Sequence, residues 1–284
     1  MSGQIAILVL AFRAPGLLRR TLEFFQGTPF HFFVHVDPKA DQAQFDFLAD
    51  YANATPAQDK FPVFWGGFNM MLAELGLLRQ ALQVDRFSRF VLISDDSFPL
   101  RPPAAIMSAL KPETQWIGQA VITNNADFSP RYRNFYSVDS DATNPQHRPV
   151  EDRTFNLTLI RELKLMEQLI LRGKKPLENL YHGAQWWCLT APAAQYVLET
   201  NDADAHLRDS FKYSLISDES YIQTIIGLSH RFQTRDTPMY FDFSRNPKPY
   251  LYTTPEELVP AYKSDKLFVR KVIDNAALLP LFGP

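Results

Sequence analysis

The stretch "IAILVLAF", residues 5–12, decides the fold because every one of its residues is apolar. Continuous apolar runs of strand length are typical of the central strands of a parallel sheet, which helices cover on both faces. The run is too short to span a membrane, and no basic segment precedes it as in a secretory signal. Residues 5–12 therefore predict a first buried strand.

Outward from this strand, helical and strand-like segments alternate. A helix is expected from Pro15, which suits a first helical turn, to Gly27, a residue type that often follows a helix. The next expected elements are a strand at 30–38, a short strand at 62–67, a helix at 69–84 with Asn69 at its cap, and a strand at 87–94. This alternation predicts an α/β fold with a mostly parallel central sheet flanked by helices.

Polar and aromatic residues stand where three of these strands end. Asp37 closes the strand at 30–38, Trp65 lies in the segment 62–67, and Asp95 and Asp96 follow the strand at 87–94. Ligands of open parallel sheets bind outside the carboxyl ends of the strands, so we expect the site at this edge. The sequence contains neither of the usual glycine-rich phosphate loops.

The second half of the chain has a different composition. Residues 124–153 are polar and predict a substrate loop or a linker, and residues 155–174 predict a helix. A strand is expected at 181–190, "YHGAQWWCLT", followed by a helix from Ala191 and a helix in "ISDESYIQTIIGL" opened by Ser217 or Asp218. The last segment, residues 247–273, is rich in lysine and arginine.

Composition excludes several classes of protein. Hydrophobic residues make up 46% of the 284 residues, which is enough for a large core. A net charge of −2 gives no reason to expect a nucleic-acid partner. The single cysteine, Cys188, allows no internal disulfide and fits a reducing compartment, so we expect a cytoplasmic protein without a transmembrane segment.

Several residues could carry chemistry, and each has a plainer interpretation. Glu219 could be a catalytic base, or could complement the dipole of the helix that it opens. Asp37, on the same strand face as His35, could bind ribose hydroxyls or merely end its strand. The basic segment "DKLFVRK" could clamp a diphosphate or form the solvated face of a helix.

The pair Trp186–Trp187 leaves two interpretations open. In a strand the two rings would point to opposite faces, one into the core and one toward a sugar, or both could be buried. His182 is interpreted as a loop histidine, and no spacing of His, Cys and Asp predicts a zinc site.

Five segments occur in an order that is similar to one known family. They are "FFVHVDPKA", "FWGGFNMMLAELGLLRQAL", "FVLISDDSFPL", "HGAQWWCLTAPAAQYVL" with "SDESYIQTII", and "KPYLYTTPEELVPAYKSDKLFVRKV". Together they resemble the Core-2/I-branching β-1,6-N-acetylglucosaminyltransferases and peptide xylosyltransferases, glycosyltransferase family 14, in a short bacterial-type form. The resemblance covers most of residues 5–272 and is weakest at 123–175.

The resemblance implies one GT-A domain over residues 1–284, with a nucleotide-binding half at 1–122 and an acceptor-binding half at 123–284. It also implies inverting transfer from a UDP-sugar to a glycan or glycoconjugate, with N-acetylglucosamine or xylose as the sugar. The family lacks a working D-x-D metal site, so no cofactor is expected and basic side chains bind the diphosphate instead. Contact with a membrane surface stays open.

Site residues follow from the resemblance by position. Glu219 matches the catalytic base. The donor side is matched by Asp37 in "HVD", with His35 beside it, and by Lys248, Arg270 and Lys271. Gln185, Trp186 and Arg131 match acceptor contacts, and we expect Asp95 and Asp96 to bind sugar hydroxyls or to cap a turn.

The chain departs from the family at Asp95, where a glycine is common, so a metal at Asp95 and Asp96 stays an alternative. Two other functions are also left open. A retaining glycoside hydrolase would use two carboxylates about 5 Å apart, such as Asp95 and Glu219. A non-catalytic relative would bind carbohydrate without turnover.

Overall fold

The computed structural model describes residues 3–84, 86–111, 113–122, 128–136, 138–139, 163–164, 167 and 179–275. Most of the predicted loop at 124–153, and all but three residues of the predicted helix at 155–174, lie outside the described residues. Among the described residues, no helix combines the length and the apolarity that crossing a bilayer requires.

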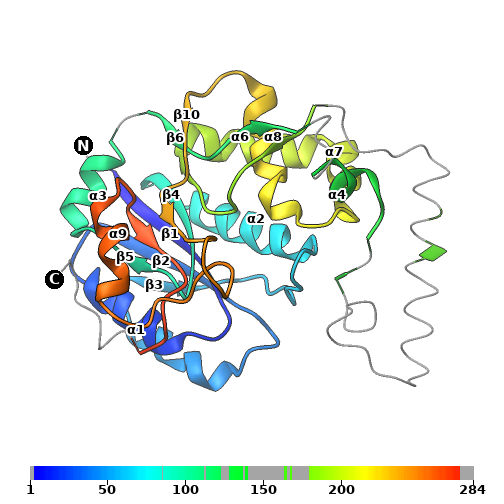
Figure 1. The fold of residues 1–284 in the computed structure, drawn as a ribbon. Helices are drawn as coiled ribbons and strands as arrows, with labels where there is room; N and C mark the ends of the chain where they lie inside the picture. The colour runs from blue at the N-terminus through cyan, green and yellow to red at the C-terminus, as the bar shows by residue number, and fades with distance from the viewer. Residues whose placement is uncertain are drawn as a thin grey trace, which may run out of the picture.

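A seven-stranded sheet forms the centre of the molecule, in the order β10-β6-β9-β4-β1-β2-β3 (Figure 1). All neighbours pair in parallel except β9, which is antiparallel to β4 and β6. Strands from both halves of the chain therefore complete one sheet. The strands are β1 (Gln4–Ala11), β2 (Phe30–Val36), β3 (Ala54–Pro56), β4 (Phe87–Ser94), β6 (Gln115–Trp116), β9 (Cys188–Thr190) and β10 (Thr234–Arg235).

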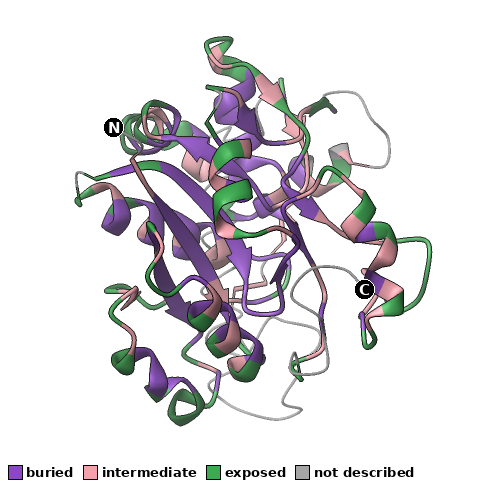
Figure 2. Ribbon diagram, turned by 90° about the vertical axis from the view of Figure 1, so that its left-hand side faces the viewer, coloured by how far each residue is buried: buried purple, intermediate pink, exposed green. Residues whose placement is uncertain are grey.

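The predicted first strand is confirmed as β1, the strand between β2 and β4. Its Ile7 pairs with Phe32 of β2 and Val91 of β4, and its buried side chains continue from Ile5 to Val9. Figure 2 shows the buried centre of the sheet beneath exposed helix surfaces. Burial on both faces explains why this strand contains no polar residue between 5 and 11.

Helices cover both faces of the sheet (Figure 1). On one side, α2 (Asn69–Leu82) contacts β1, β2 and β4, and α6 (Ala191–Ala203) contacts β4 and β9. On the other side, α1 (Pro15–Phe24) adjoins a small sheet of β11 (Met239–Tyr240), β12 (Phe268–Val269) and β5 (Phe98–Pro99). The remaining described elements are η1 (Gln42–Asp50), α3 (Pro103–Ala109), β7 (Ala120–Val121), α4 (Ser129–Arg133), β8 (Tyr181–His182), α7 (Ala205–Lys212), η2 (Ser217–Glu219), α8 (Tyr221–Ser229), η3 (Glu256–Leu258) and α9 (Val259–Lys263).

The predicted strand at 62–67 is wrong, and the third parallel strand is β3. Side chains near the end of β2 bind the backbone of the segment 61–63 instead. His35 Nε2 accepts from Phe61 N at 2.9 Å, Asp37 Oδ2 accepts from Val63 N at 3.1 Å, and Lys39 Nζ donates to Val63 O. A segment whose backbone groups bind side chains does not need a strand partner.

The predicted cap at Asn69 is also wrong. Asn69 is the first residue of α2, and the carboxylate of Asp139 accepts from Phe68 N at 2.6 Å and Asn69 N at 3.1 Å. An acidic side chain from a distant segment thus satisfies the first N–H groups of this helix.

Three further local predictions need correction. Residues 181–190 form two strands in different sheets, since β8 pairs with β7 whereas β9 pairs with β4 and β6. Between them, Gly183 lies so close to Gly118 that a Cβ would be 2.0 Å from the Gly118 carbonyl oxygen. The helix predicted from Ser217 starts as the short 3₁₀ turn η2, and α8 begins at Tyr221. The basic segment "DKLFVRK" contains strand β12, so it is not a helix face.

Candidate active site

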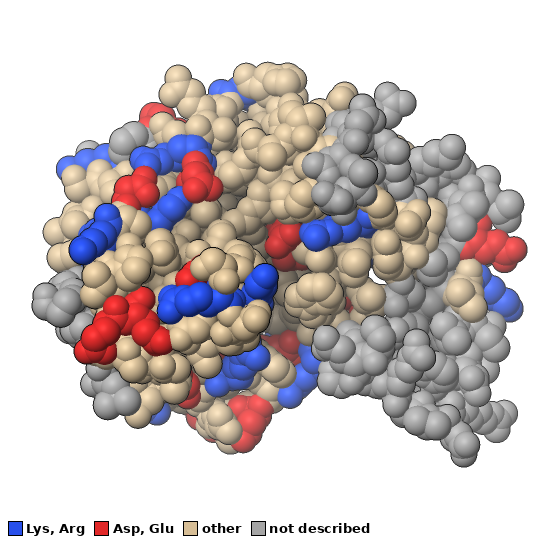
Figure 3. Space-filling model, viewed as in Figure 1, with Lys and Arg blue, Asp and Glu red and all other residues tan. Residues whose placement is uncertain are grey.

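A cavity of about 930 Å³ opens at the carboxyl ends of β1, β2 and β4. Figure 3 shows a face of the molecule that is hollowed near its centre, with basic and acidic side chains around the hollow. Every side chain that the sequence singled out for the site lines this cavity. They are His35, Asp37, Asp95, Asp96, Arg131, Gln185, Trp186, Glu219, Lys248, Arg270 and Lys271.

Glu219 lies in η2 and is partly exposed to the cavity. Its Oε2 is 3.2 Å from Nη1 of Arg131 and 3.9 Å from Nε2 of His182. Burial raises the pKa of the Glu219 carboxyl, and Arg131 opposes that rise. The arrangement gives a carboxylate that is more basic than one in water and that has a cation beside it to favour its ionised form.

His182, interpreted from the sequence as a loop residue, is a neighbour of Glu219 on the cavity wall. Burial and then the charge of Arg131 lower the pKa of His182 to about 4. The imidazole is therefore neutral at physiological pH and adds no charge to the carboxylate. The spacing of His182 and Glu219 in the sequence gave no sign of this contact.

Asp218 also lines the cavity, and the sequence indicated no role for it beyond opening a helix. Its Oδ1 is buried, and no described residue donates a hydrogen bond to it. Burial, and then the neighbouring Glu219 charge, raise the pKa of Asp218 to about 7. The two adjacent acids thus differ: Asp218 keeps its proton up to about pH 7, whereas the Arg131 charge favours the ionised form of Glu219.

Arg270 and Lys271 bring positive charge to the same cavity. Nη2 of Arg270 is 3.2 Å from Oδ1 of Asp96, and its guanidinium lies over the ring of Trp186, 4.4 Å from the centroid. Ser94 Oγ donates to the same Asp96 oxygen at 2.5 Å. Burial would raise the pKa of Asp96, but Arg270, Ser94 and Lys271 outweigh it and lower that pKa.

Asp95 is engaged by the backbone. Its Oδ2 accepts from the N–H groups of Phe12, Arg13 and Ala14 at 2.7, 2.7 and 2.8 Å. Burial raises its pKa, and these three donors oppose the rise. Asp95 therefore holds the loop between β1 and α1 in place, which differs from the expected capping of the turn that follows it.

The described residues contain no group of three or more His, Cys, Asp and Glu side chains that could hold a metal ion. The two adjacent acids do not form a shared ligand set, since Asp96 faces Arg270 and Asp95 faces the 12–14 backbone.

On the other wall, Asp37 and His35 make contacts within the protein. Both oxygens of Asp37 bind Lys39 Nζ, at 3.0 and 2.8 Å, and His35 is buried against the backbone of Phe61. Lys39 lines the cavity as well and forms an ion pair with Asp37.

The question left open for the two tryptophans is answered, because both are buried. Trp187 is fully buried, with Nε1 3.4 Å from Oε2 of the buried Glu74, and Trp186 lies under Arg270. Gln185 donates to Oε1 of Glu74 at 2.9 Å, which fixes its amide on the cavity wall. Lys248 lines the cavity from the segment between β11 and η3.

Comparisons with known proteins find one relative and one matching family model. The sequence is 24% identical over 230 residues to xylosyltransferase 2 of Bos taurus, an alignment that covers 78% of this chain and 24% of that protein. The chain thus spans about a quarter of the length of this relative.

The family model described as "Branch: Core-2/I-Branching enzyme" matches residues 5–260. The match begins in β1 and ends in α9, so it includes Glu219 and Lys248 but stops before Arg270 and Lys271. Because it takes in most of the chain, this protein belongs to the Core-2/I-branching enzyme family of glycosyltransferases.

Proposed function

We propose that this chain is an inverting glycosyltransferase that moves a sugar from a UDP-sugar to a hydroxyl of a glycan or glycoconjugate without an essential metal ion. One observation carries the proposal: a single cavity is lined by one accessible carboxylate, Glu219, and by the adjacent cations Arg270 and Lys271. Inversion requires one base at the attacking hydroxyl, and departure of UDP requires positive charge at the diphosphate.

The reaction is a single displacement at C1 of the donor sugar. Glu219 takes the proton of the acceptor hydroxyl while that oxygen forms its bond to C1. The bond between C1 and the β-phosphate oxygen breaks on the opposite face, and UDP leaves with the electron pair. Arg270 and Lys271, assisted by Lys248, stabilise the negative charge that develops on the leaving diphosphate.

Metal independence is supported by the partners of the two acids at the end of β4. Asp96 already has a cationic partner in Arg270, and Asp95 already has three backbone donors. A divalent ion would have to displace the first and compete with the second. In the proposed reaction Arg270 instead supplies the positive charge that the leaving diphosphate requires.

The donor sugar follows from relatives. N-acetylglucosamine fits the family's branching enzymes, and xylose fits the similarity to xylosyltransferase 2. On the acceptor side, Arg131 contacts Glu219, and Gln185 and Trp186 line the same cavity. We propose that Arg131 donates hydrogen bonds to acceptor hydroxyls and that Gln185 accepts one through Oε1, because its amide N–H groups already bind Glu74 and Met70.

The test starts with calorimetric titration of UDP into the purified protein, in EDTA and then with manganese. We expect equal binding in both buffers and a large loss of affinity in Lys271→Ala. UDP release from UDP-xylose or UDP-N-acetylglucosamine in the presence of an acceptor panel should be lost in Glu219→Gln, with UDP affinity unchanged.

Each other outcome identifies another function. UDP binding that requires manganese would indicate a metal site at Asp95 and Asp96. Hydrolysis of an oligosaccharide without nucleotide would indicate a glycoside hydrolase. Sugar binding with no UDP binding and no turnover would indicate a carbohydrate-binding protein.

A further inference from the structure

Trp65 differs from every other tryptophan of the chain in its exposure. Its side chain is 64% exposed, whereas Trp116, Trp186 and Trp187 are at most 5% exposed. The other exposed phenylalanines and tryptophans among the described residues are Phe12 and Phe243, at 47% and 53%, and they line the same cavity as Trp65. Exposed aromatic rings gathered at one cavity indicate a surface for a ligand.

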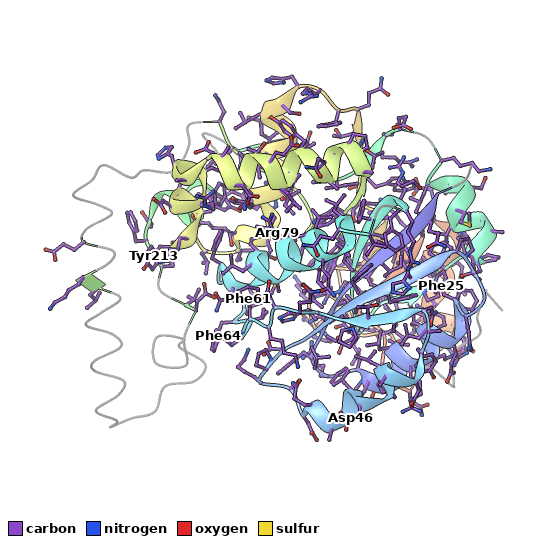
Figure 4. All side chains as sticks on the ribbon, turned by 180° about the vertical axis from the view of Figure 1, so that it is seen from behind. Phe25, Asp46, Phe61, Phe64, Arg79 and Tyr213 are labelled. Atoms are coloured by element: carbon purple, nitrogen blue, oxygen red, sulfur yellow. The ribbon has the colours of Figure 1, made fainter. Side chains whose placement is uncertain are left out.

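The segment that carries Trp65 is fixed on both sides. Before it, Val63 binds Asp37 and Lys39, and Lys39 Nζ lies 4.4 Å from the ring centroid of Phe64. Figure 4 labels Phe61 and Phe64 in this segment, at one end of α2. An exposed ring on an anchored backbone loses little conformational freedom when a ligand covers it.

After Trp65, the backbone turns toward the base. Gly66 has a φ of +80°, and its carbonyl accepts from Ile216 N at 2.8 Å. A Cβ at Gly66 would lie 2.9 Å from Cδ1 of Leu215, so the two segments are in close contact. This contact joins the residue after Trp65 to the residue three before Glu219.

The contact of Gly66 with Ile216 places Trp65 near the base and therefore favours the acceptor, and not the diphosphate, as its ligand. The hydroxyl that Glu219 deprotonates belongs to the acceptor, whereas the cations for UDP come from the segment at 270–271. A pyranose ring has a face of C–H groups that packs on an aromatic ring, and its hydroxyls remain free at the edge. We propose that Trp65 is the platform on which the acceptor sugar stacks, an inference that rests on the proposed function.

The platform predicts a specific kinetic effect. Trp65→Ala should raise the KM for the acceptor about tenfold, which matches a typical stacking contribution, and should leave the KM for the UDP-sugar unchanged. Trp65→Phe keeps a flat ring and should recover most of the loss. Val121→Ala, an exposed apolar residue that does not line the cavity, is the matched control and should change neither constant.

Binding can be measured without turnover, because Trp65 is the exposed tryptophan and the other three are buried. Acrylamide should quench wild-type fluorescence and quench Trp65→Phe much less. Methyl β-xyloside, methyl β-galactoside and methyl β-N-acetylglucosaminide are then added at high concentration with saturating UDP. At least one should protect Trp65 from quenching in the wild type.

The outcomes separate this inference from the proposed function. Protection by UDP alone, with no further effect of any glycoside, would make Trp65 a uridine contact and overturn the inference. Absence of protection by all three glycosides and by the best acceptor of the transfer assay would also overturn it. Calorimetry of UDP and UDP release by the same wild-type sample report on the proposed function independently of either result.

Discussion

Arg270 and Asp96 form an ion pair whose side chains are only 16% and 8% exposed, with Nη2 3.2 Å from Oδ1. The pair joins the end of β4 to the residue that follows β12, two segments 174 residues apart. It also places a guanidinium at the strand end where a metal was the alternative. The Asp96 charge is thereby compensated by the protein itself.

Removing Asp96 should therefore destabilise the fold. Asp96→Ala leaves the mostly buried guanidinium of Arg270 without its carboxylate, and we expect a loss of about 3 kcal/mol in the free energy of unfolding. Urea denaturation measures it. The matched control is Asp202→Ala, which breaks an ion pair with Arg79 whose side chains are 46% and 52% exposed and should cost under about 1 kcal/mol. Equal losses in the two variants would show that the ion pair of Arg270 with Asp96 stabilises the fold no more than an exposed ion pair does.

Asp95 allows a test of its structural role against a role as a metal ligand. Asp95→Asn keeps an oxygen that can accept from residues 12–14, so it should fold and transfer sugar nearly as the wild type does. Asp95→Ala removes that acceptor and should lose about 2 kcal/mol, since partly buried N–H groups are left unpaired. Activity that falls equally in both variants, together with a need for manganese, would contradict this assignment.

The strands of the sheet could be predicted where burial alone determines the residues. The predicted strand at 87–94 coincides with β4, and 5–12 and 30–38 differ from β1 and β2 only at their ends. The segment 62–67 has the same apolar character, yet side chains near the end of β2 bind its backbone. The three residues of β3, "ATP", form no apolar run that would predict a strand. They are a strand because they pair with Phe32, Phe33 and Val34 of β2.

The residues of the site could be predicted, but not their partners. The resemblance placed Glu219, Arg270 and Lys271 together, and the structure brings them to one cavity. It gave no sign that Asp95 binds a backbone segment more than 80 residues earlier. The effects of burial could not be predicted either, because the raised pKa of Asp218 and the lowered pKa of His182 result from surroundings that distant segments build.

The contact between Arg131 and Glu219 should set the acid limb of the pH–rate profile. Transfer requires ionised Glu219, whose pKa burial raises and Arg131 lowers. Arg131→Met removes the lowering influence, so the acid limb of kcat/KM should move to higher pH. The control Arg235→Met loses an exposed ion pair with Asp265 and should leave the limb in place. If the acid limb of Arg131→Met stayed in place or moved to lower pH, the ionisation of Glu219 would not be what controls the rate.

Asp218 should make the stability of the protein depend on pH, with a predictable sign. The carboxyl titrates at about 7 in the folded state against 3.8 in the reference state. Below pH 4 the carboxyl is protonated in both the folded and the unfolded state, so its burial as a neutral group costs no ionisation free energy. As the pH rises through this window the unfolded state ionises first, so this group's contribution to stability is lost and reaches its minimum above pH 7.

Asp218→Asn removes the titration and should flatten this loss. About two pH units of the window lie between pH 5 and pH 7, so the stability of Asp218→Asn relative to the wild type should increase by about 3 kcal/mol from pH 5 to pH 8. Urea unfolding at the two pH values measures the change. The exposed Asp46, labelled in Figure 4, provides the control, and Asp46→Asn should follow the wild type at both values. The groups that act on Asp218 are Glu219, Arg131, Arg270 and Glu74, and they are unaltered in this variant. A constant difference between Asp218→Asn and the wild type would mean that Asp218 is ionised throughout, and Glu219 would then have to take its proton beside a second buried charge.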